Sequence, residues 1–388
     1  MSAAGKAVAA LAARMEVADA HLYVEATPLL ADVWTGIPVV AAALSERFLA
    51  RMPERVSFFR DDTLIGHADI AELLARRTGA LLAPEIMGRT RPFAPLDLYR
   101  CSGPALGFYP SVKPVPGMFD REVSVVHDLS TLVTPEFHAA RNIRFHLETL
   151  HAEVASNDLT LCVSDATLED VAHYLGPPRS RLAAMPNAVE WSPDLALRFE
   201  AEFGGKPAEP FVLVLGTREP RKNHALIFAL IEARPELLDA YRFVFAGPPG
   251  WLEDRLALPE PVRRGFERGR ILHTGFLDEF AKYALLRRAR FSVYASLYEG
   301  FGLPVLESLS LGTPCLSSLS SSLPEVGRDA ALHFDPLSVE DLSDRIAAVA
   351  ALDASGRRAL SRRCIEAAAH FSWDASFAIL CGHLARLV

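Results

Sequence analysis

The chain has 388 residues, a length that suggests two domains. Half of the residues are hydrophobic and 23% are charged, a composition typical of globular proteins that excludes an intrinsically disordered chain. Its formal net charge of −8 gives no electrostatic reason to expect a nucleic-acid partner. Charges, Gly or Pro interrupt every apolar stretch before it reaches the roughly 20 residues that cross a bilayer.

The cysteines and the first residues bear on the compartment. The Ala-rich start soon becomes charged and then β-like, which does not favour a signal peptide. Five scattered cysteines lack CxxC spacing, and we interpret them as buried apolar residues in a reducing compartment: Cys101, Cys162, Cys315, Cys364 and Cys381. A soluble cytoplasmic protein is therefore expected.

Strands and helices are predicted to alternate along the first half of the chain. The predicted strands are residues 20–27, 123–128 and 159–165, and the predicted helices are residues 36–52 and 143–155. Residues 84–120 are rich in Pro and Gly and are predicted to form an irregular, exposed excursion.

The second half repeats this alternation more clearly. Its predicted strands are residues 211–217, 241–247, 270–276, 291–297 and 313–319, and its predicted helices are residues 224–233, 280–289, 303–312 and 339–352. Nearly continuous apolar strands between helices indicate parallel sheets covered on both faces.

A Pro- and Gly-rich stretch at 192–210 is the expected boundary between two doubly wound α/β domains, 1–195 and 207–370. The last segment, 371–388, is predicted to be an amphipathic helix.

The stretch YEGFGLPVLE at 298–307 is the first candidate site. A helix is predicted to begin near Pro304, directly after a strand, and its free N–H groups would form an anion site. Glu299 at the strand exit and Glu307 one turn into the helix could bind hydroxyls beside that anion, as a nucleotide-sugar requires. Alternatively, Glu299 caps the helix and Glu307 is a solvated surface charge.

Three more candidates also follow strands or begin helices. GTREPRKNH at 216–224 places Arg218, Arg221 and Lys222 where they could neutralise a diphosphate, although an exposed basic turn is the alternative. His127 directly follows a strand, where it is either a substrate contact or a structural histidine. Gly36, in TGIP, could bring backbone N–H groups to a phosphate.

Several chemistries lack their motifs. The chain contains no HExxH, EF-hand loop, Walker motif, GxSxG, or GxGxxG following a strand, so metalloprotease, calcium-binding, P-loop, α/β-hydrolase and simple dinucleotide-binding readings have no support.

Together these motifs resemble those of the retaining glycosyltransferases of family 4, whose signature is two glutamates separated by seven residues. The resemblance includes EGFGLPVLE at 299–307, GTREPRKN at 216–223, FVFAGPPG at 243–250, ILHTGFLDE at 271–279, SSLPEVG at 321–327 and FSW at 371–373. In the first half it includes TGIPVV, VVHDLSTLVTPEFH and CVSDATLEDVAHYLG, and it is weakest over residues 45–120.

The resemblance implies a GT-B fold, in which two Rossmann-like domains face each other across a cleft and the C-terminal helix crosses back to the first domain. The first domain would bind the acceptor and the second the nucleotide-sugar donor. The reaction would be a retaining transfer of a sugar, with GDP-mannose favoured, to a saccharide or lipid-linked saccharide in surface polysaccharide synthesis.

Site roles follow from the same resemblance. Glu299 would bind the donor sugar at the reaction centre, Glu307 the ribose, and Lys222 with Arg221 or Arg218 the diphosphate. Backbone groups of Phe301, Gly302 and Leu303 would help to hold the diphosphate, His127 would face the donor sugar, Gly36 would approach the phosphates, and Leu277 belongs to the expected base-binding segment. Many family members have arginine where this chain has Thr217, which leaves the choice between Arg218 and Arg221 open.

Neither a metal nor another cofactor is expected, because protein cations would replace the metal. Two alternatives stay open: a GT-B enzyme that is not a transferase, such as an epimerase or hydrolase-like enzyme, and a catalytically inactive nucleotide-sugar-binding subunit. Arg47, Arg51 and Arg55, at helical spacing beside apolar residues, could make weak peripheral contact with the inner face of the cytoplasmic membrane, although a solvated helix is favoured.

Overall fold

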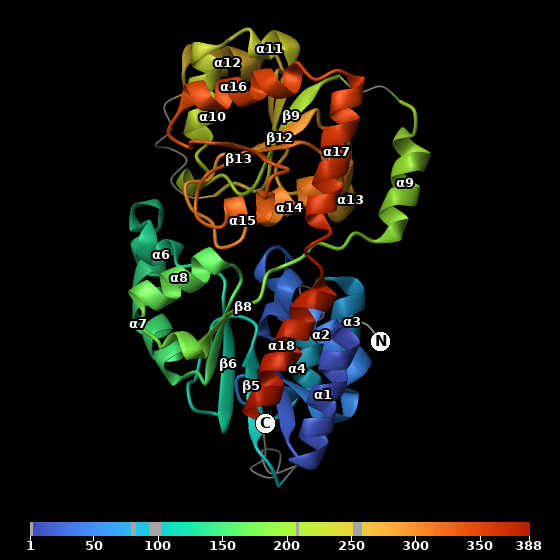
Figure 1. Ribbon diagram of the computed structural model, residues 1–388, viewed down its shortest axis with the longest axis vertical. Helices are drawn as coiled ribbons and strands as arrows, with labels where there is room; N and C mark the ends of the chain where they lie inside the picture. Colours follow the sequence, from blue (N-terminus) through green and yellow to red (C-terminus); the bar gives the residue numbers. More distant parts are fainter. Residues whose placement is uncertain (1–2, 79–82, 93–101, 207–208, 251–257) are drawn as a thin grey trace. The chain divides into compact units, whose positions relative to one another are not determined.

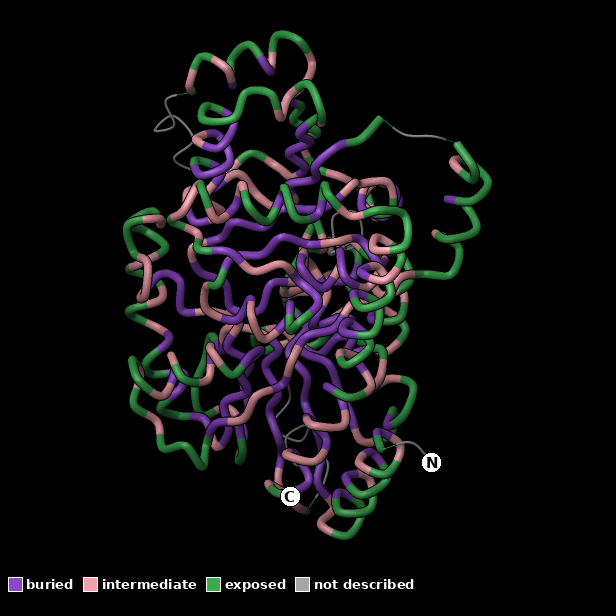
Figure 2. The backbone as a smooth tube through the Cα atoms, turned by 45° about the horizontal axis from the view of Figure 1, so that its top comes forward, coloured by how far each residue is buried: buried purple, intermediate pink, exposed green. Residues whose placement is uncertain are grey.

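The computed structural model describes residues 3–78, 83–92, 102–206, 209–250 and 258–388. The chain forms two compact units (Figure 1). Unit 1 comprises residues 1–129, 141–187 and 371–388, and unit 2 comprises residues 130–140 and 188–370. Figure 2 shows the strands of both units in buried stretches and many helices with exposed faces, as expected for sheets covered by helices.

Unit 1 is built on an eight-stranded sheet of order β4-β3-β2-β1-β5-β6-β7-β8. Its strands are β1 His21–Glu25, β2 Val56–Arg60, β3 Thr63–Ile65, β4 Arg91–Pro92, β5 Ala105–Tyr109, β6 Arg121–Val126, β7 Leu159–Cys162 and β8 Leu182–Ala184. The pairs from β2 through β8 are parallel, and β3 and β4 add an antiparallel edge. The strands predicted at 20–27, 123–128 and 159–165 are confirmed as β1, β6 and β7.

The helices of unit 1 are α1 Ala3–Val17, α2 Ile37–Arg51, α3 His67–Arg76, α4 Ala83–Arg89, α7 Ala140–Ser156, α8 Asp165–Tyr174 and α18 Trp373–Leu387. The predicted helices at 36–52 and 143–155 are confirmed as α2 and α7. Among the described residues of this unit there are also three short 3₁₀ turns: η1 Thr27–Leu30, η2 Pro53–Arg55 and η4 Arg179–Arg181.

The prediction of an exposed excursion at 84–120 is wrong over part of its length. Residues 105–109 form β5, a buried strand that lies between β1 and β6 at the middle of the sheet. The ring of Phe119 packs over Gly107, within a cluster that includes Tyr23 and Tyr109. Residues 93–101, with Cys101, lie outside the described residues; the other four cysteines are buried thiols.

Helix α18 packs against α1 and α2 of unit 1 (Figure 1). The rings of Phe377 and Phe48 lie 4.8 Å apart, and Asp374, in the first turn of α18, accepts 2.8 Å contacts from both Arg47 and Arg51. Arg55 pairs with Asp19 at 3.2 Å. The three arginines considered for lipid contact therefore pair with carboxylates of their own unit.

Unit 2 is built on a six-stranded sheet of order β11-β10-β9-β12-β13-β14, parallel throughout. Its strands are β9 Phe211–Leu215, β10 Arg242–Ala246, β11 Ile271–His273, β12 Phe291–Tyr294, β13 Cys315–Ser318 and β14 Leu332–Phe334. All five strands predicted in this half are confirmed, and β14 is added at the edge. Val212, Phe243 and Phe291 belong to its main core, which explains the continuous apolar runs.

The helices of unit 2 are α6 Ser130–Val133, α9 Pro193–Phe203, α10 His224–Ala233, α11 Leu237–Ala240, α12 Glu260–Glu267, α13 Glu279–Arg288, α14 Leu303–Ser310, α15 Leu323–Gly327, α16 Val339–Ala350 and α17 Ala354–Ala368. The four helices predicted in this half correspond to α10, α13, α14 and α16. Two 3₁₀ turns, η3 Pro135–Phe137 and η5 Pro220–Lys222, belong to the same unit.

The structure places the boundary between the units differently from the sequence prediction. Unit 2 already begins again at residue 188, and the stretch interpreted as a linker contains helix α9. Phe199 of this helix packs with Phe280 and Tyr283 of α13, which attaches α9 to unit 2. The Pro and Gly residues at 192–210 thus begin and end a helix: Pro193 is its first residue and Gly204 follows its last.

We expect Gly107→Ala to destabilise unit 1. A Cβ atom at this position would lie 2.3 Å from Cδ2 of Phe119, a ring that is packed in the core and has little room to move. Overpacking of this kind costs about 1–3 kcal/mol. Urea unfolding should show a lower midpoint for this variant. Gly88→Ala, on an exposed turn of α4 where a Cβ meets nothing within 4 Å, is the control in the same unit; equal midpoints for the two variants would contradict the packing of β5.

Candidate functional site

The site lies where the strand order of unit 2 reverses. Along its sheet the chain runs outward from β9 through β10 to β11, then returns to the other side of β9 with β12. In sheets of this order, ligands bind outside the carboxyl ends of the strands at the reversal point. The segment after β9 carries Arg221 and Lys222, and the segment after β12 carries Glu299, so the reversal brings these two predicted motifs together.

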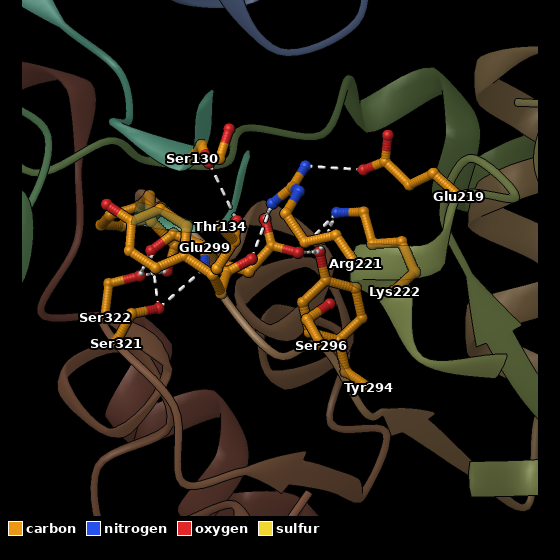
Figure 3. Close-up of polar contacts among 12 residues, drawn as sticks. Ser130, Thr134, Glu219, Arg221, Lys222, Tyr294, Ser296, Glu299, Ser321 and Ser322 are labelled. Atoms are coloured by element: carbon orange, nitrogen blue, oxygen red, sulfur yellow. Dashed lines mark hydrogen bonds and ion pairs between the residues drawn. The ribbon is translucent and has the colours of Figure 1, made fainter. Parts of the chain in front are cut away.

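Glu299 is held between two cations (Figure 3). Its Oε1 lies 2.5 Å from Nζ of Lys222, and its Oε2 lies 3.0 Å from Nη1 of Arg221. Arg221 also donates to Oε1 of Glu219 at 2.7 Å and to the carbonyl of Tyr298 at 2.7 Å. All four charged side chains are buried, with exposed fractions from 3% to 12%.

Tyr294, the last residue of β12, completes this network and was not predicted. Its hydroxyl donates to Oε1 of Glu299 at 2.8 Å and accepts from Nζ of Lys222 at 2.7 Å. Burial and then the charge of Glu299 raise the pKa of Tyr294 well above its usual range, so the hydroxyl stays a donor. The strand FSVY reads as apolar, and a polar atom on its last residue is the signal that could have identified this tyrosine.

Two serines after β13 fix the backbone of the Glu299 segment (Figure 3). Ser321 Oγ accepts from the amide of Glu299 at 2.7 Å, and Ser322 Oγ donates to the carbonyls of Glu299 and Phe301, both at 2.9 Å. The sequence placed these serines in a family motif without assigning them a role. They hold the turn that carries Glu299 into helix α14.

Gly302 permits the turn into α14. Its φ of +103° is one that L side chains rarely adopt, and a Cβ here would lie 2.5 Å from Cδ2 of Leu323. The helix begins at Leu303, directly after Phe301 and Gly302, with Pro304 in its first turn. The N-terminus of an α-helix, with its free amides and positive dipole end, therefore follows the Glu299 segment. Gly302 occupies the N-cap, which disfavours the alternative in which Glu299 caps the helix.

Charge decides the ionisation of the central pair. Burial alone would raise the pKa of Glu299, but the positive charges of Arg221 and Lys222 outweigh it and hold that pKa at about 2. Burial lowers the pKa of Lys222 below its usual range, although Glu299 opposes this shift. Glu299 is thus a fixed carboxylate across the physiological range, and its negative charge supports the charged form of Lys222.

The two arginines of the 216–224 segment differ in their surroundings. The guanidinium of Arg221 already contacts two carboxylates and a carbonyl, so it positions Glu299 and Glu219. The backbone amide of Arg218 donates to the carbonyl of Pro248 at 3.1 Å, which joins the segments that follow β9 and β10, while its side chain is half-buried.

Glu307 is not an isolated surface charge. Its Oε1 lies 2.5 Å from Nζ of Lys282, a residue of α13, and its side chain is 12% exposed. The alternative of a solvated glutamate is therefore wrong. Leu277, from the expected base-binding segment, packs its side chain on the core cluster of Leu213 and Val244.

His127 and Gly36 belong to unit 1. His127 follows β6, and its Nε2 lies 2.7 Å from the carbonyl oxygen of Pro110. Because a carbonyl only accepts, Nε2 carries the proton; burial lowers the pKa of His127, which leaves Nδ1 of the neutral ring as an acceptor. Gly36 precedes α2 with a φ of +58°.

Two absences hold for the described part of the chain. No group of three or more His, Cys, Asp or Glu residues gathers there as a metal site would require. None of its helices combines the length and apolar character needed to cross a bilayer.

Comparison with known proteins identifies a family for this chain, and the match to the family model lies in the second half. The family model described as "Glycosyl transferases group 1" matches residues 198–371. The O-antigen chain mannosyltransferase B of Escherichia coli is 34% identical over 271 residues, which cover 67% of this chain and 69% of that protein. The serotype-specific mannosyltransferase WbdA of Escherichia coli is 32% identical over 65% of this chain, but the match spans 32% of that longer protein.

Solved structures show the same fold at low identity. WaaG, a glycosyltransferase involved in lipopolysaccharide biosynthesis, superposes with a TM-score of 0.62 at 13% identity, covering 94% of this chain and 99% of that one. Anabaena Alr3699/HepE in complex with UDP-glucose has a TM-score of 0.61 at 14% identity, covering 95% and 98%. The predicted GT-B fold is confirmed.

We expect His224, which begins α10 beside this site, to make stability depend on pH. Burial, and then the charges of His273 and Lys222, lower the pKa of His224 to about 3 from 6.5. Between these values the unfolded state binds more protons, so stability falls as the pH falls, by about 1.4 kcal/mol per pH unit for this group.

Urea unfolding from pH 7.5 to pH 4.5 checks this expectation. The slope of unfolding free energy against pH should be less positive in His224→Gln than in the unsubstituted protein, because the contribution of His224 is lost. His370→Gln, on an exposed residue after α17, controls for the loss of a histidine. Parallel slopes for the protein and His224→Gln would contradict a neutral, buried His224.

Proposed function

The chain belongs to the glycosyl transferases group 1 family, and from this premise we propose that it moves a sugar from a nucleotide-sugar to a saccharide or lipid-linked saccharide, with retention at the anomeric carbon. The observation that carries this proposal is the buried cluster of Glu299, Arg221 and Lys222 at the strand reversal of unit 2. The relative named as an O-antigen chain mannosyltransferase supports a role in surface polysaccharide assembly.

The leaving group sets the electrostatic requirement. Breaking the bond between sugar and diphosphate builds negative charge on the nucleoside diphosphate. Lys222 and the N-terminus of α14 are fixed positive groups that would stabilise this charge, and such preorganised groups commonly contribute about 10²–10³ in rate each. Arg218 would supply the further cation, because Arg221 already contacts Glu219 and Glu299.

Glu299 would orient the sugar. As a carboxylate that stays ionised, it can accept hydrogen bonds from sugar hydroxyls, and its contacts with Lys222, Arg221 and Tyr294 fix its position before the donor arrives. The carboxylate of Glu307 would accept hydrogen bonds from the ribose hydroxyls of the donor. The contacts of His127 and Gly36 with the donor remain predictions, and so do metal independence and a cytoplasmic or peripheral membrane location.

Mannose is the favoured sugar and GDP the favoured carrier. Five relatives carry mannosyltransferase in their names, among them an MMP alpha-(1->4)-mannosyltransferase of Mycolicibacterium hassiacum that is 42% identical over 78 residues. HepE, similar in fold alone, was solved with UDP-glucose, which makes a panel of donors necessary.

The first test measures binding and turnover of GDP-, UDP- and dTDP-sugars, with and without EDTA. We expect GDP-mannose to bind and to be hydrolysed slowly without acceptor, with no effect of EDTA. Glu299→Gln, which keeps the shape of the side chain, should lose about 10²–10³ of turnover while still binding nucleotide. Glu232→Gln, on an exposed position of α10, is the matched control.

The other outcomes are equally informative. Absence of binding at millimolar concentration would remove the transferase proposal. If free sugar were the main product even with a saccharide acceptor, a hydrolase-like enzyme would be favoured. Interconversion of two nucleotide-sugars would favour an epimerase. Binding without turnover would favour an inactive subunit.

Substitution of Arg221 should mainly lower stability, and substitution of Arg218 should mainly weaken nucleotide binding. Arg221→Ala leaves Glu219 and Glu299 short of a buried partner, and we expect it to cost about 3–5 kcal/mol of stability. Arg218→Ala should weaken nucleoside diphosphate binding about tenfold, with a smaller loss of stability. Thermal unfolding measures the stability loss and calorimetric titration the loss of nucleoside diphosphate binding, with Arg263→Ala, at an exposed position, as the control. If Arg221→Ala did not lower stability and both variants lost the same affinity, the assignment of Arg221 to structure and Arg218 to the diphosphate would be contradicted.

A further inference from the structure

Glu307 is one member of a closed ring of contacts that joins three segments of unit 2. Lys282 Nζ lies 2.5 Å from Oε1 of Glu307 and 5.3 Å from the centre of the Trp191 ring. Trp191 Nε1 donates to Ser310 Oγ at 2.9 Å, and Ser310 Oγ donates to the carbonyl of Glu307 at 2.8 Å. The ring therefore holds both the carboxylate and the backbone of Glu307.

Trp191 and Lys282 are held by packing as well as by polar contacts. Trp191 lies edge-to-face with Tyr283, the neighbour of Lys282 on α13, at 5.4 Å between ring centres. It also packs on the core clusters of Leu213 and Phe199. A rigid aromatic ring beneath the ammonium group restricts the positions of Lys282, whose side chain is 29% exposed.

We propose that Lys282 and Trp191 are positioning residues for Glu307, which they orient so that Oε2 can accept hydrogen bonds from the ribose hydroxyls of a nucleoside diphosphate. Lys282 occupies Oε1, and among the described residues Oε2 has no hydrogen-bond partner. This inference rests on the proposed function, in which Glu307 binds the ribose.

The lysine has a second physical effect at this position. A bare carboxylate beside a diphosphate would repel the ligand, and the ammonium group of Lys282 offsets that charge. A pure charge effect would act equally on every nucleoside diphosphate, because all of them carry the same phosphates. A positioning effect would act most on ligands that carry the 2′-hydroxyl, which the 2′-deoxy forms lack, so the two effects can be separated.

The experiment compares calorimetric titrations of GDP with 2′-deoxyGDP, and of UDP with 2′-deoxyUDP. The proteins are the unsubstituted chain, Lys282→Met, Lys282→Arg and, as a matched control, Lys206→Met on an exposed residue after α9. Methionine keeps the apolar stem over Trp191 and removes the charge, and arginine restores a donor for Oε1.

We expect the unsubstituted protein to bind the ribose form about tenfold more tightly than the deoxy form. Lys282→Met should lose about tenfold for the ribose form and stay within twofold for the deoxy form, so that the preference disappears. Lys282→Arg should retain most of the preference, and Lys206→Met all of it. In turnover, the loss in Lys282→Met should fall on KM for the donor more than on kcat.

Three results would overturn the inference. An equal loss on both forms would show that Lys282 acts by charge alone, and an unchanged preference would show that it does not orient Glu307. Equal binding of both forms by the unsubstituted protein, with turnover intact, would show that Glu307 does not recognise the 2′-hydroxyl of the ribose, while the transferase proposal stands. If no nucleotide binds and no donor is turned over, the proposed function itself fails.

Discussion

The pairing of Glu299 with two buried cations is the constraint on which this site depends. Glu219 and Glu299 contribute two negative charges, and Arg221 and Lys222 contribute two positive charges, in an environment where an unpaired ion is costly. The network therefore fixes the segments after β9 and β12 to each other. The serines after β13 add the backbone of Glu299 to the same frame, so that the carboxylate is positioned by three loops of one sheet edge.

This balance shapes how a ligand would be received. Arg221 and Lys222 are already paired with carboxylates, so the approach of a diphosphate would add net negative charge to a neutral cluster. Helix α14, the half-buried Arg218 and Lys222 are the positive groups that could meet it without breaking the Glu299 pairs, because the ammonium group of Lys222 has one donor more than its contacts with Glu299 and Tyr294 require. Glu307, one turn further along α14, has its own cation in Lys282 and adds no uncompensated charge.

The sequence was sufficient to predict strands and motif residues that depend on local patterns, but not the strands and side chains whose roles depend on contacts far along the chain. Continuous apolar runs identified β9 to β13, and the motif residues Glu299 and Lys222 do lie together, because parallel strands end at one edge. Strand β5 was not predicted, because Gly107 and the surrounding Pro and Gly residues are typical of a loop. The glycine is needed there because the ring of Phe119 packs over it. Lys282 and Trp191 carry no signal in isolation, since their roles arise from partners far along the chain. Tyr294 carries the weak signal of a hydroxyl at the end of an apolar strand, but its contact with Lys222 joins residues 72 positions apart.

Helix α18 bears on the order in which the molecule can be completed. It covers α1 and α2 of unit 1, yet it follows the whole of residues 188–370 along the chain. At about 5–20 residues per second, a ribosome would need roughly 10–40 seconds to make that intervening segment. Unit 2 could fold during this time, whereas Phe48, whose ring packs against Phe377 of α18, would still lack that contact. The unit whose residues are made first would thus be the last to be completed.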